Sequence, residues 1–449
     1  MAIRELTMPK RIFWLGMHKV LTKTELPRLR TLGYEVFNPP YLSSVKDQSA
    51  CLEWDADQPT TLPKNVFQAL SKFNFFYNEI PADIAKLLND YFDAVVVTIS
   101  PRWLRSILGV YKGTVIYRTY GQHYALSDEL KREGLLLEIA NRNNFVFMPH
   151  AEEALYGEHS WLKDIAVVSP YCLPSDILQH EGSWGKCDRR ANEIIITCPN
   201  IDNPFFREHY QFLKKNFSEK HFLYYGVQIS DVDDPQVVGT LAREKLIARF
   251  RRAAGYLYTY TDPRVCYLPP IEMMVLGGPV LFLKGSLLDR YFGEDAPGRC
   301  LDIRDAKEKI ERLLVGDKSF IHAIILSQDS VKRRYLPDFV WPHFDKVIVD
   351  SLESNKEPSH WLTVDPASKV TGKKRIYLLH HFPGAPVIFD GESYAAYDGI
   401  PRVMRQIAQT LNKNCDHEII ITARYDQAEM FRGFFASLEP IKIISGCFL

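Results

Sequence analysis

The sequence predicts an α/β protein with two Rossmann-like parallel-sheet domains facing a cleft and a partial α/β unit at the carboxyl end. Three observations lead to this prediction. Short apolar runs alternate with helix-compatible segments, which is the pattern of βα units in a parallel sheet. Polar connectors interrupt the alternation after about residue 170 and again near residue 350. At roughly 150 residues per domain, a chain of 449 residues has room for about three folded units.

The amino-terminal part begins with an apolar run at 11–15, a helix-compatible stretch that ends at Gly33, and a second apolar run at 34–37. Continuous apolar runs of this kind suit strands that are covered on both faces. Further runs lie at 94–99, 114–117, 145–148 and 165–168. The polar stretch 180–190 then indicates a connector. We therefore predict a first domain over residues 1–180.

A second series of apolar runs predicts another parallel sheet. The runs lie at 193–198, 222–226, 256–259 and 279–283. Between the second and third runs, apolar residues recur on one face of a helix, at Leu246, Ile247, Phe250, Ala253 and Ala254. We predict a second domain over 188–349. Ligands of open parallel sheets bind at the carboxyl ends of the strands, so the site is expected between the domains.

Residues 350–372 lose periodicity and gain serine, proline and charge, which predicts a linker. Over 373–449 the alternation restarts, with apolar runs at 375–381 and 418–422 and a helix from Asp398 to Leu411. This part is too short for another pair of domains. We expect either a small accessory unit or, favoured by the apolar ending, the truncated start of a second copy of the first architecture.

Composition excludes several classes of protein. A hydrophobic fraction of 46% suits buried cores and excludes a disordered chain. With 55 basic and 55 acidic residues, no global field attracts nucleic acid, which is therefore not an expected partner. No apolar run approaches the roughly 18 to 20 residues of a membrane span, and no signal peptide is evident, so we expect a cytoplasmic protein. The eight cysteines form no C-x-x-C pair, so neither zinc nor a disulfide framework is expected.

The segment 255–280 carries the most functional information. An apolar strand leads into a loop, two prolines then open a helix, and two glycines end it. Glu272 therefore falls in the first helical turn, beside the end of the preceding strand. A carboxylate there can accept hydrogen bonds from two vicinal hydroxyls, as a ribose-binding acid does. The alternative is a glutamate that only complements the helix dipole, and position does not separate the two.

Residues 268–280 resemble the donor-nucleotide region of GT-B glycosyltransferases, especially family four, whose pattern is L-P-x-x-E-A-M-A-x-G-x-P-V. The segments 237–246 and 307–314 resemble neighbouring parts of that family, so the similarity spans roughly residues 190–345. The resemblance implies a GT-B architecture with no metal or other cofactor. It places a nucleoside diphosphate sugar on the second domain and the acceptor on the first. It also assigns Glu272 to the nucleotide ribose.

One departure from the family pattern affects the sugar site. The family has a glutamate eight positions before the ribose glutamate, where this chain has Arg264. That glutamate contacts the transferred sugar in the family. Asp262 could substitute for it as a catalytic carboxylate, although Asp262 with the following proline is also an ordinary turn opener. Arg264 could instead bind a phosphate or an acidic sugar. The donor sugar and the stereochemical outcome therefore stay open.

A departing diphosphate needs cationic groups or helix N-terminal amides when no metal is bound. Arg207, after the strand at 193–198, is our preferred diphosphate ligand. Lys214 of the same helix is a second candidate, and its alternative role is part of a solvated helix face. We interpret the acidic run 231–234 as a loop and not as a metal site. The predicted donor-binding set also includes Tyr260, Pro270 and Gly226.

Two histidines are candidates for the base that deprotonates the acceptor hydroxyl, because imidazole titrates near neutral pH. His18 follows the first strand, and a similar first-loop histidine occurs in inverting GT-B enzymes such as the plant-type glucosyltransferases. His123 lies in the polar, aromatic loop 119–124, which suits sugar binding. A packed or hydrogen-bonded loop histidine is the alternative for both.

Residues 399–411 approximate the family-four pattern G-x-x-R-x-x-x-x-L-A-x-x-L, which implies a second glycosyltransferase module. The predicted function is a metal-independent hexosyl- or glycosyltransferase of bacterial cell-surface polysaccharide biosynthesis, such as lipopolysaccharide or capsule. Its partners would be a nucleotide sugar and a glycan or lipid-linked glycan, with peripheral contact at the inner face of the membrane left open. The rival functions are a nucleotide-sugar epimerase or phosphorylase on the same fold, and a catalytically silent glycan-binding or scaffolding module.

Overall fold

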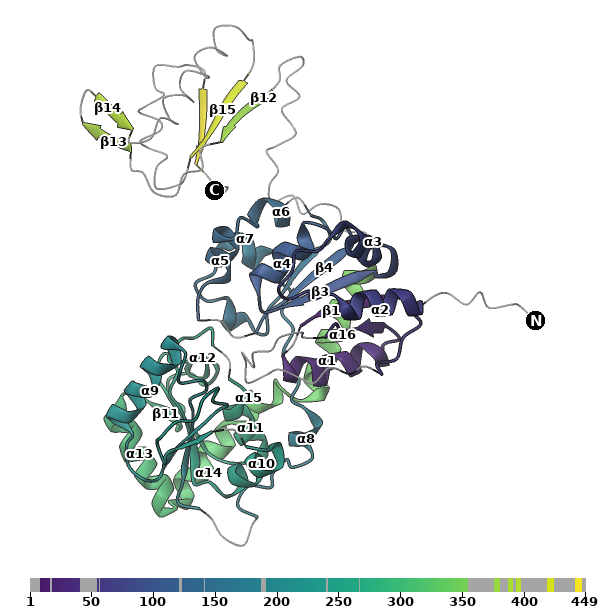
Figure 1. Ribbon diagram of the computed structural model, residues 1–449. Helices are drawn as coiled ribbons and strands as arrows, with labels where there is room; N and C mark the ends of the chain where they lie inside the picture. Colours follow the sequence, from purple (N-terminus) through teal and green to yellow (C-terminus); the bar gives the residue numbers. More distant parts are fainter. Residues whose placement is uncertain are drawn as a thin grey trace. The chain divides into compact units, whose positions relative to one another are not determined.

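The computed structural model describes residues 9–353 except 17, 41–54, 56, 121–122, 141, 187–190, 240 and 266, together with five strands beyond residue 374 (Figure 1). The chain divides into two compact units. One comprises Met1–Glu129 and Asn144–Glu357, and the other comprises Leu130–Asn143 and Pro358–Leu449. Both large sheets belong to the first unit. The domain boundaries predicted from the sequence stay predictions.

The first sheet has the order β2-β1-β3-β4-β5, and all its strands are parallel. The strands are β1 (Arg11–Leu15), β2 (Glu35–Phe37), β3 (Ala94–Thr98), β4 (Thr114–Arg118) and β5 (Phe145–Met148). The helical segments between them and after β5 are α1 (Lys19–Thr31), α2 (Lys64–Lys72), α3 (Ala82–Tyr91), α4 (Pro101–Leu108), α5 (Leu126–Arg132), α6 (Leu136–Ala140), η1 (Glu152–Leu155) and α7 (Ser160–Asp164). The strand expected at 165–168 is wrong, because Ala166 forms only an isolated bridge with Phe147 before the chain leaves the sheet.

The second sheet, also parallel, has the order β11-β10-β9-β6-β7-β8. Its strands are β6 (Ile194–Thr197), β7 (Phe222–Tyr225), β8 (Val237–Gly239), β9 (Gly255–Tyr258), β10 (Val280–Leu283) and β11 (Arg299–Cys300). Its helices are α8 (Ser175–Leu178), α9 (Pro204–Asn216), α10 (Arg243–Arg252), α11 (Pro269–Leu276), α12 (Leu287–Phe292), α13 (Ile303–Val315), α14 (Lys318–Ser327) and α15 (Asp329–Arg333).

Helices cover both faces of the second sheet, as its continuous apolar strands require. Ile194 and Ile196 of β6 pack in one buried cluster, whereas Ile195 between them packs in another. Alternate residues of the same strand thus face opposite cores, because side chains alternate along a strand. The prediction of an α/β fold with two Rossmann-like parallel-sheet domains is confirmed.

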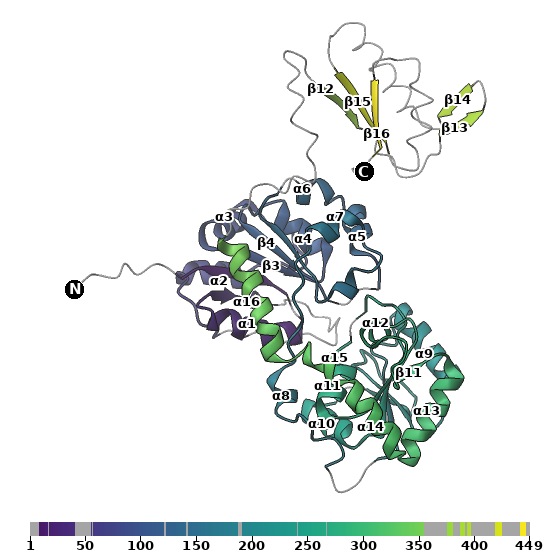
Figure 2. The same ribbon diagram turned by 180° about the vertical axis from the view of Figure 1, so that it is seen from behind.

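The last helix of the first unit, α16 (Pro337–Glu353), returns to the first sheet and lies beside α1 (Figure 2). Arg28 of α1 donates hydrogen bonds to both carboxylate oxygens of Asp345, one of them at 2.8 Å. Its guanidinium also lies 5.6 Å from the ring centre of Trp341. The chain therefore crosses between the two sheets twice, once before α8 and once through α16.

The second unit contains a parallel sheet in the order β12-β15-β16 and an antiparallel pair, β13 with β14. The bounds are β12 (Arg375–Leu379), β13 (Val387–Asp390), β14 (Ser393–Ala396), β15 (Glu418–Ala423) and β16 (Ile441–Ser445). The parallel pairing of β12 with β15 agrees with the alternation of strands and helices that the sequence predicts here. The helix expected at 398–411 lies outside the described residues. Among the helices that the structure describes, none has the length and hydropathy of a membrane span.

Candidate functional site

Loops at the carboxyl ends of strands from both sheets meet around His123. His123 follows β4, and its ring centre lies 4.0 Å from that of Phe205 in α9 and 6.1 Å from that of Tyr260 after β9. The hydroxyl of Tyr267 lies 3.4 Å from Nε2 of His123. Arg264 donates a hydrogen bond from Nη2 to the carbonyl oxygen of His123 at 3.3 Å. We call these five residues the interdomain loop cluster.

Asp262 and Arg264 form a close ion pair beside this cluster. The carboxylate of Asp262 accepts hydrogen bonds from Nε at 3.1 Å and from Nη2 at 2.9 Å, and from the backbone N–H of Arg264 at 2.9 Å. Burial disfavours the charged form of Asp262, but these bonds and the charge of Arg264 outweigh it and lower the pKa of the carboxyl. Asp262 is therefore an ionised carboxylate that Arg264 already holds, two residues from the position where the family has its glutamate.

His209 of α9 extends the cluster and was not predicted. Its ring stacks on Tyr260 with centroids 4.0 Å apart, and its Nε2 lies 3.0 Å from Oγ1 of Thr259. Burial lowers the pKa of His209 to about 4, and it lowers that of His123 to about 4 as well. Both rings are therefore neutral at pH 7. The spacing of 205 and 209 on one face of α9 was the available signal.

His18 lies at the start of α1, after β1, and its ring packs against the loop that follows β4. Its ring centre lies 4.0 Å from that of Tyr120, which stacks on Tyr171 at 4.8 Å. Burial lowers the pKa of His18 to about 4. Among the described residues, the ring contact of His18 thus lies within the first domain, whereas those of His123 reach the second.

Glu272 lies in the first turn of α11, as the sequence predicts, and is only 5% exposed. Arg243, the first residue of α10, donates to both its carboxylate oxygens, at 2.8 and 3.0 Å. Arg243 also binds Asp176 of α8, with two contacts of 3.2 Å. Each carboxylate oxygen of Glu272 keeps a further lone pair for a hydroxyl donor. The ribose role stays a prediction, and it requires the ligand to share Glu272 with Arg243.

The loop between β6 and α9 is shaped by a close approach to Gly226. Gly226 has a φ of +145°, and a Cβ on it would lie 2.6 Å from Cα of Pro199. In the same loop Asn200 adopts a positive φ of +45°, and its side-chain oxygen is buried with no hydrogen-bond partner among the described residues. Backbone strain and unsatisfied polar atoms concentrate at functional sites. Sequence reasoning missed Asn200, for which only the adjacent proline was a signal.

The remaining donor candidates lie in different places. Arg207 is exposed in the first turns of α9, where Nη2 donates to the carbonyl oxygen of Asp202 at 3.0 Å. Lys214 lies in the last turn of the same helix and pairs with Asp234 at 2.9 Å. The structure therefore does not bring Lys214 together with the loops at the carboxyl ends of the strands. Pro270 is buried in the first turn of α11.

No family model and no curated protein matches this sequence. Among solved structures, it is similar to a glycosyltransferase from Rickettsia africae, with 11% identity, 78% of this chain and 100% of that chain covered, and a TM-score of 0.49. It is also similar to the α,α-trehalose 6-phosphate synthase from Burkholderia multivorans, with 11% identity, 77% of this chain and 96% of that chain covered, and a TM-score of 0.48. For HepE of Anabaena, in complex with UDP and glucose, the identity is 11%, 76% of this chain and 100% of that chain are covered, and the TM-score is 0.46. Similarities this weak carry no argument about activity.

Proposed function

We propose that the protein is a GT-B glycosyltransferase that moves a sugar from a nucleoside diphosphate sugar to a hydroxyl of a growing glycan. The observation that carries this proposal is the interdomain loop cluster. His123 of the first sheet contacts Phe205 and Arg264 of the second, at the carboxyl ends of parallel strands. Ligands of open α/β sheets bind at that edge, so two substrates held by different sheets would meet there.

The donor nucleotide would bind on the second sheet. The first amides of α9, a helix of 13 residues, and the exposed guanidinium of Arg207 supply positive potential beside the β6–α9 loop. That potential suits a diphosphate leaving group without a metal ion. Glu272 would accept hydrogen bonds from the ribose hydroxyls while it stays paired with Arg243. Tyr260, two residues after β9, stacks on His209 of α9 with ring centres 4.0 Å apart.

His123 is the proposed base, with His18 as the alternative. During transfer the acceptor oxygen would form a bond to the anomeric carbon, and the bond from that carbon to the diphosphate oxygen would break. The hydroxyl proton would pass to the neutral imidazole. An anionic diphosphate close by favours the protonated ring, which offsets the effect of burial on the pKa of His123.

We further propose that the acceptor is a glycan or lipid-linked glycan of bacterial surface polysaccharide, used at the inner face of the cytoplasmic membrane. The resemblance of residues 268–280 to family four supports this assignment. The resemblance of 399–411 supports a second glycosyltransferase module. The balanced formal charge supports an acceptor other than nucleic acid. No metal or other cofactor enters the proposal.

Isothermal titration with UDP, GDP and ADP tests the donor site. The wild-type protein is expected to bind at least one of them, and Glu272→Gln to weaken that binding at least tenfold, because an amide accepts fewer hydrogen bonds than a carboxylate. Glu311→Gln, at an exposed position of α13, is the matched control and should bind as the wild type does. Absence of binding by all three nucleotides, or equal binding by Glu272→Gln, would overturn the proposal.

A second candidate function is nucleotide binding without transfer. The pairing of Arg264 with Asp262 favours it, because the only carboxylate near the family's glutamate position on this loop is already bound. Incubation with nucleotide sugars and an acceptor glycan distinguishes the two functions. Nucleotide binding without release of the diphosphate indicates a silent module. Conversion of the donor without an acceptor, or consumption of inorganic phosphate, would instead indicate an epimerase or a phosphorylase.

A further inference from the structure

A cavity of about 880 Å³ lies between the edge of the first sheet and the helices that close the second. Its walls come from the segment after β5, from α12, and from the junction of α15 with α16. The residues that carry the argument are His150, Glu153, Tyr291, Arg334, Tyr335 and Phe339. None of the residues predicted for the donor site or for catalysis lines it. It is therefore a second candidate binding site within the first unit.

The cavity is lined by equal numbers of glutamates and arginines. Glu152, Glu153, Arg333 and Arg334 line it, Arg334 binds Glu153 at 2.9 Å, and Arg333 pairs with Asp329 at 2.6 Å. Burial, followed by the charge of Arg118, lowers the pKa of His150 to about 3, so this ring adds no charge at pH 7. A site for a phosphate or a carboxylate needs an excess of cationic groups. The balance favours an uncharged ligand.

The aromatic side chains of the cavity offer flat apolar surfaces next to these polar groups. Arg334 lies 4.7 Å from the ring centre of Tyr291, and the hydroxyls of Tyr291 and Tyr335 are 3.3 Å apart. Phe339 exposes 40% of its surface. A sugar ring has apolar C–H faces that pack on aromatic rings, and hydroxyls at its edge that bond carboxylates and guanidiniums. A saccharide therefore matches both features of this cavity.

His150 gives a second indication of a ligand. It is 4% exposed and stacks on Tyr171 at 4.9 Å, and its Nε2 has no hydrogen-bond partner among the described residues. A buried nitrogen left unpaired is destabilising, so a ligand that pairs with it is favoured. A hydroxyl both donates and accepts, so it can pair with either tautomer of the ring. His150 also lines a much smaller pocket together with Arg264 and Tyr120, so this one residue borders both spaces.

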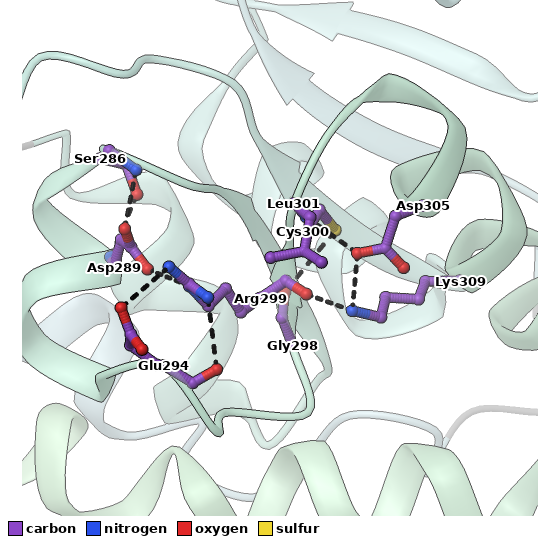
Figure 3. A network of polar contacts seen from close by, with 10 residues as sticks. Ser286, Asp289, Glu294, Gly298, Arg299, Cys300, Leu301, Asp305 and Lys309 are labelled. Atoms are coloured by element: carbon purple, nitrogen blue, oxygen red, sulfur yellow. Dashed lines mark hydrogen bonds and ion pairs between the residues drawn. The ribbon is translucent and has the colours of Figure 1, made fainter.

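The helix that supplies Tyr291 is held in place by the polar network of Figure 3. Asp289 of α12 accepts a hydrogen bond from Nε of Arg299 in β11 at 2.5 Å. Arg290, next to Tyr291, lies 3.8 Å from the ring centre of Tyr156. An aromatic wall fixed before the ligand arrives loses little entropy on binding.

We propose that this cavity binds the saccharide of the acceptor and that this saccharide is uncharged. The inference rests on the proposed function and adds to it the place and the chemical class of the acceptor. The bound saccharide stacks on Tyr291 and Phe339, and its hydroxyls bond Glu152, Glu153 and His150.

Saturation-transfer NMR on the full chain tests the inference, with maltose, cellobiose and lactose as uncharged probes and glucose 6-phosphate as the anionic probe. At least one disaccharide should bind, and Phe339→Ala and Tyr291→Ala should each weaken its binding at least fivefold. Tyr291→Phe keeps the ring and should bind within about twofold of the wild type. Tyr77→Ala removes an exposed aromatic ring of the first domain and is the control.

UDP, GDP and ADP binding, measured in parallel on the same variants, separates this inference from the proposed function. The cavity variants should bind nucleotide as the wild type does. Absence of disaccharide binding, equal binding by Phe339→Ala and Tyr291→Ala, or stronger binding of glucose 6-phosphate than of every disaccharide would overturn the inference. If the wild type still binds a nucleotide, these results would not contradict the proposed donor site. If the wild type binds none of the three nucleotides, the proposed function itself is contradicted.

Discussion

Arg243 donates hydrogen bonds to both carboxylate oxygens of Glu272, at 2.8 and 3.0 Å, and the same guanidinium reaches Asp176 at 3.2 Å. One cation thus joins the first turns of α10 and α11 to α8, the short helix before the second sheet. The carboxylate that we propose for the ribose is oriented by two hydrogen bonds from one arginine. Its orientation depends on a residue 29 positions earlier in the chain.

Replacement of Arg243 should destabilise the protein strongly. Arg243→Ala leaves the buried carboxylate of Glu272 without its partner, and breaking a buried ion pair costs about 3 to 5 kcal/mol. Arg304→Ala is the control, because Arg304 is 86% exposed and its pair with Glu308 should contribute little. Urea denaturation measures both. Similar losses in the two variants would contradict this account of Arg243.

Stability should fall as the pH falls from about 6.5 to about 4. Burial lowers the pKa of His18, His123 and His209 to about 4, whereas an unfolded histidine titrates near 6.5. The unfolded state therefore binds more protons in this window. The contribution of these histidines to the free energy of unfolding is fully present above pH 6.5 and is lost as the pH falls toward 4. The loss for one buried histidine is on the order of 3 kcal/mol.

Denaturant titrations at pH 7.5 and pH 4.5 check this prediction in the wild type and in His209→Gln. The variant should lose less stability between the two pH values, because it lacks one group that must take up a proton on unfolding. His322→Gln, at an exposed position of α14, is the control. If the wild type were more stable at pH 4.5 than at pH 7.5, the predicted direction of the pH dependence would be wrong.

Gly226→Ala should disturb the β6–α9 loop. The added Cβ would lie 2.6 Å from Cα of Pro199, and the φ of +145° suits glycine only. Gly293→Ala separates the two effects, since Gly293 has a φ of +78° with open space around its Cβ. We expect a loss of about 1 to 2 kcal/mol for Gly293→Ala and a larger loss for Gly226→Ala. Only Gly226→Ala should also weaken nucleotide binding, which titration calorimetry measures.

The network of Figure 3 predicts unequal effects of two acidic residues on the same arginine. Asp289→Ala removes the close partner of Arg299, which is itself buried, and should cost about 1 to 3 kcal/mol. Glu294 is 90% exposed and lies 4.0 Å from Arg299, so Glu294→Ala should change stability by under about 0.5 kcal/mol. Thermal unfolding distinguishes them, and an equal effect would refute the assignment.

Much of the sheet arrangement followed from the sequence, because continuous apolar runs are the mark of strands buried on both faces. The runs at 11–15 and 94–99 became β1 and β3. Two edge strands were missed for physical reasons. The three residues of β8 are only half-buried, and β11 consists of an arginine and a cysteine that lack an apolar run. The run at 165–168 was apolar but serves as a connector.

The sequence predicted those parts of the site that depend on local signals, such as prolines and glycines at helix ends. It did not predict the parts that depend on packing between distant segments. Prolines and glycines placed Glu272 in the first turn of α11, and the structure has it there. Its partner Arg243 is brought to it by the packing of α10 against α11, which no local pattern records. In the same way, Arg264 and His123 are 141 positions apart and meet only because two sheets face each other.

Hydrogen–deuterium exchange of the full chain with and without saturating UDP, GDP or ADP tests most directly whether the carboxyl ends of the second sheet hold the donor. With a nucleotide that binds, amide exchange should slow at 199–207 and 260–272. Protection confined to the outer helices α13 and α14, or no change with any of the three nucleotides, would contradict a donor site in this place.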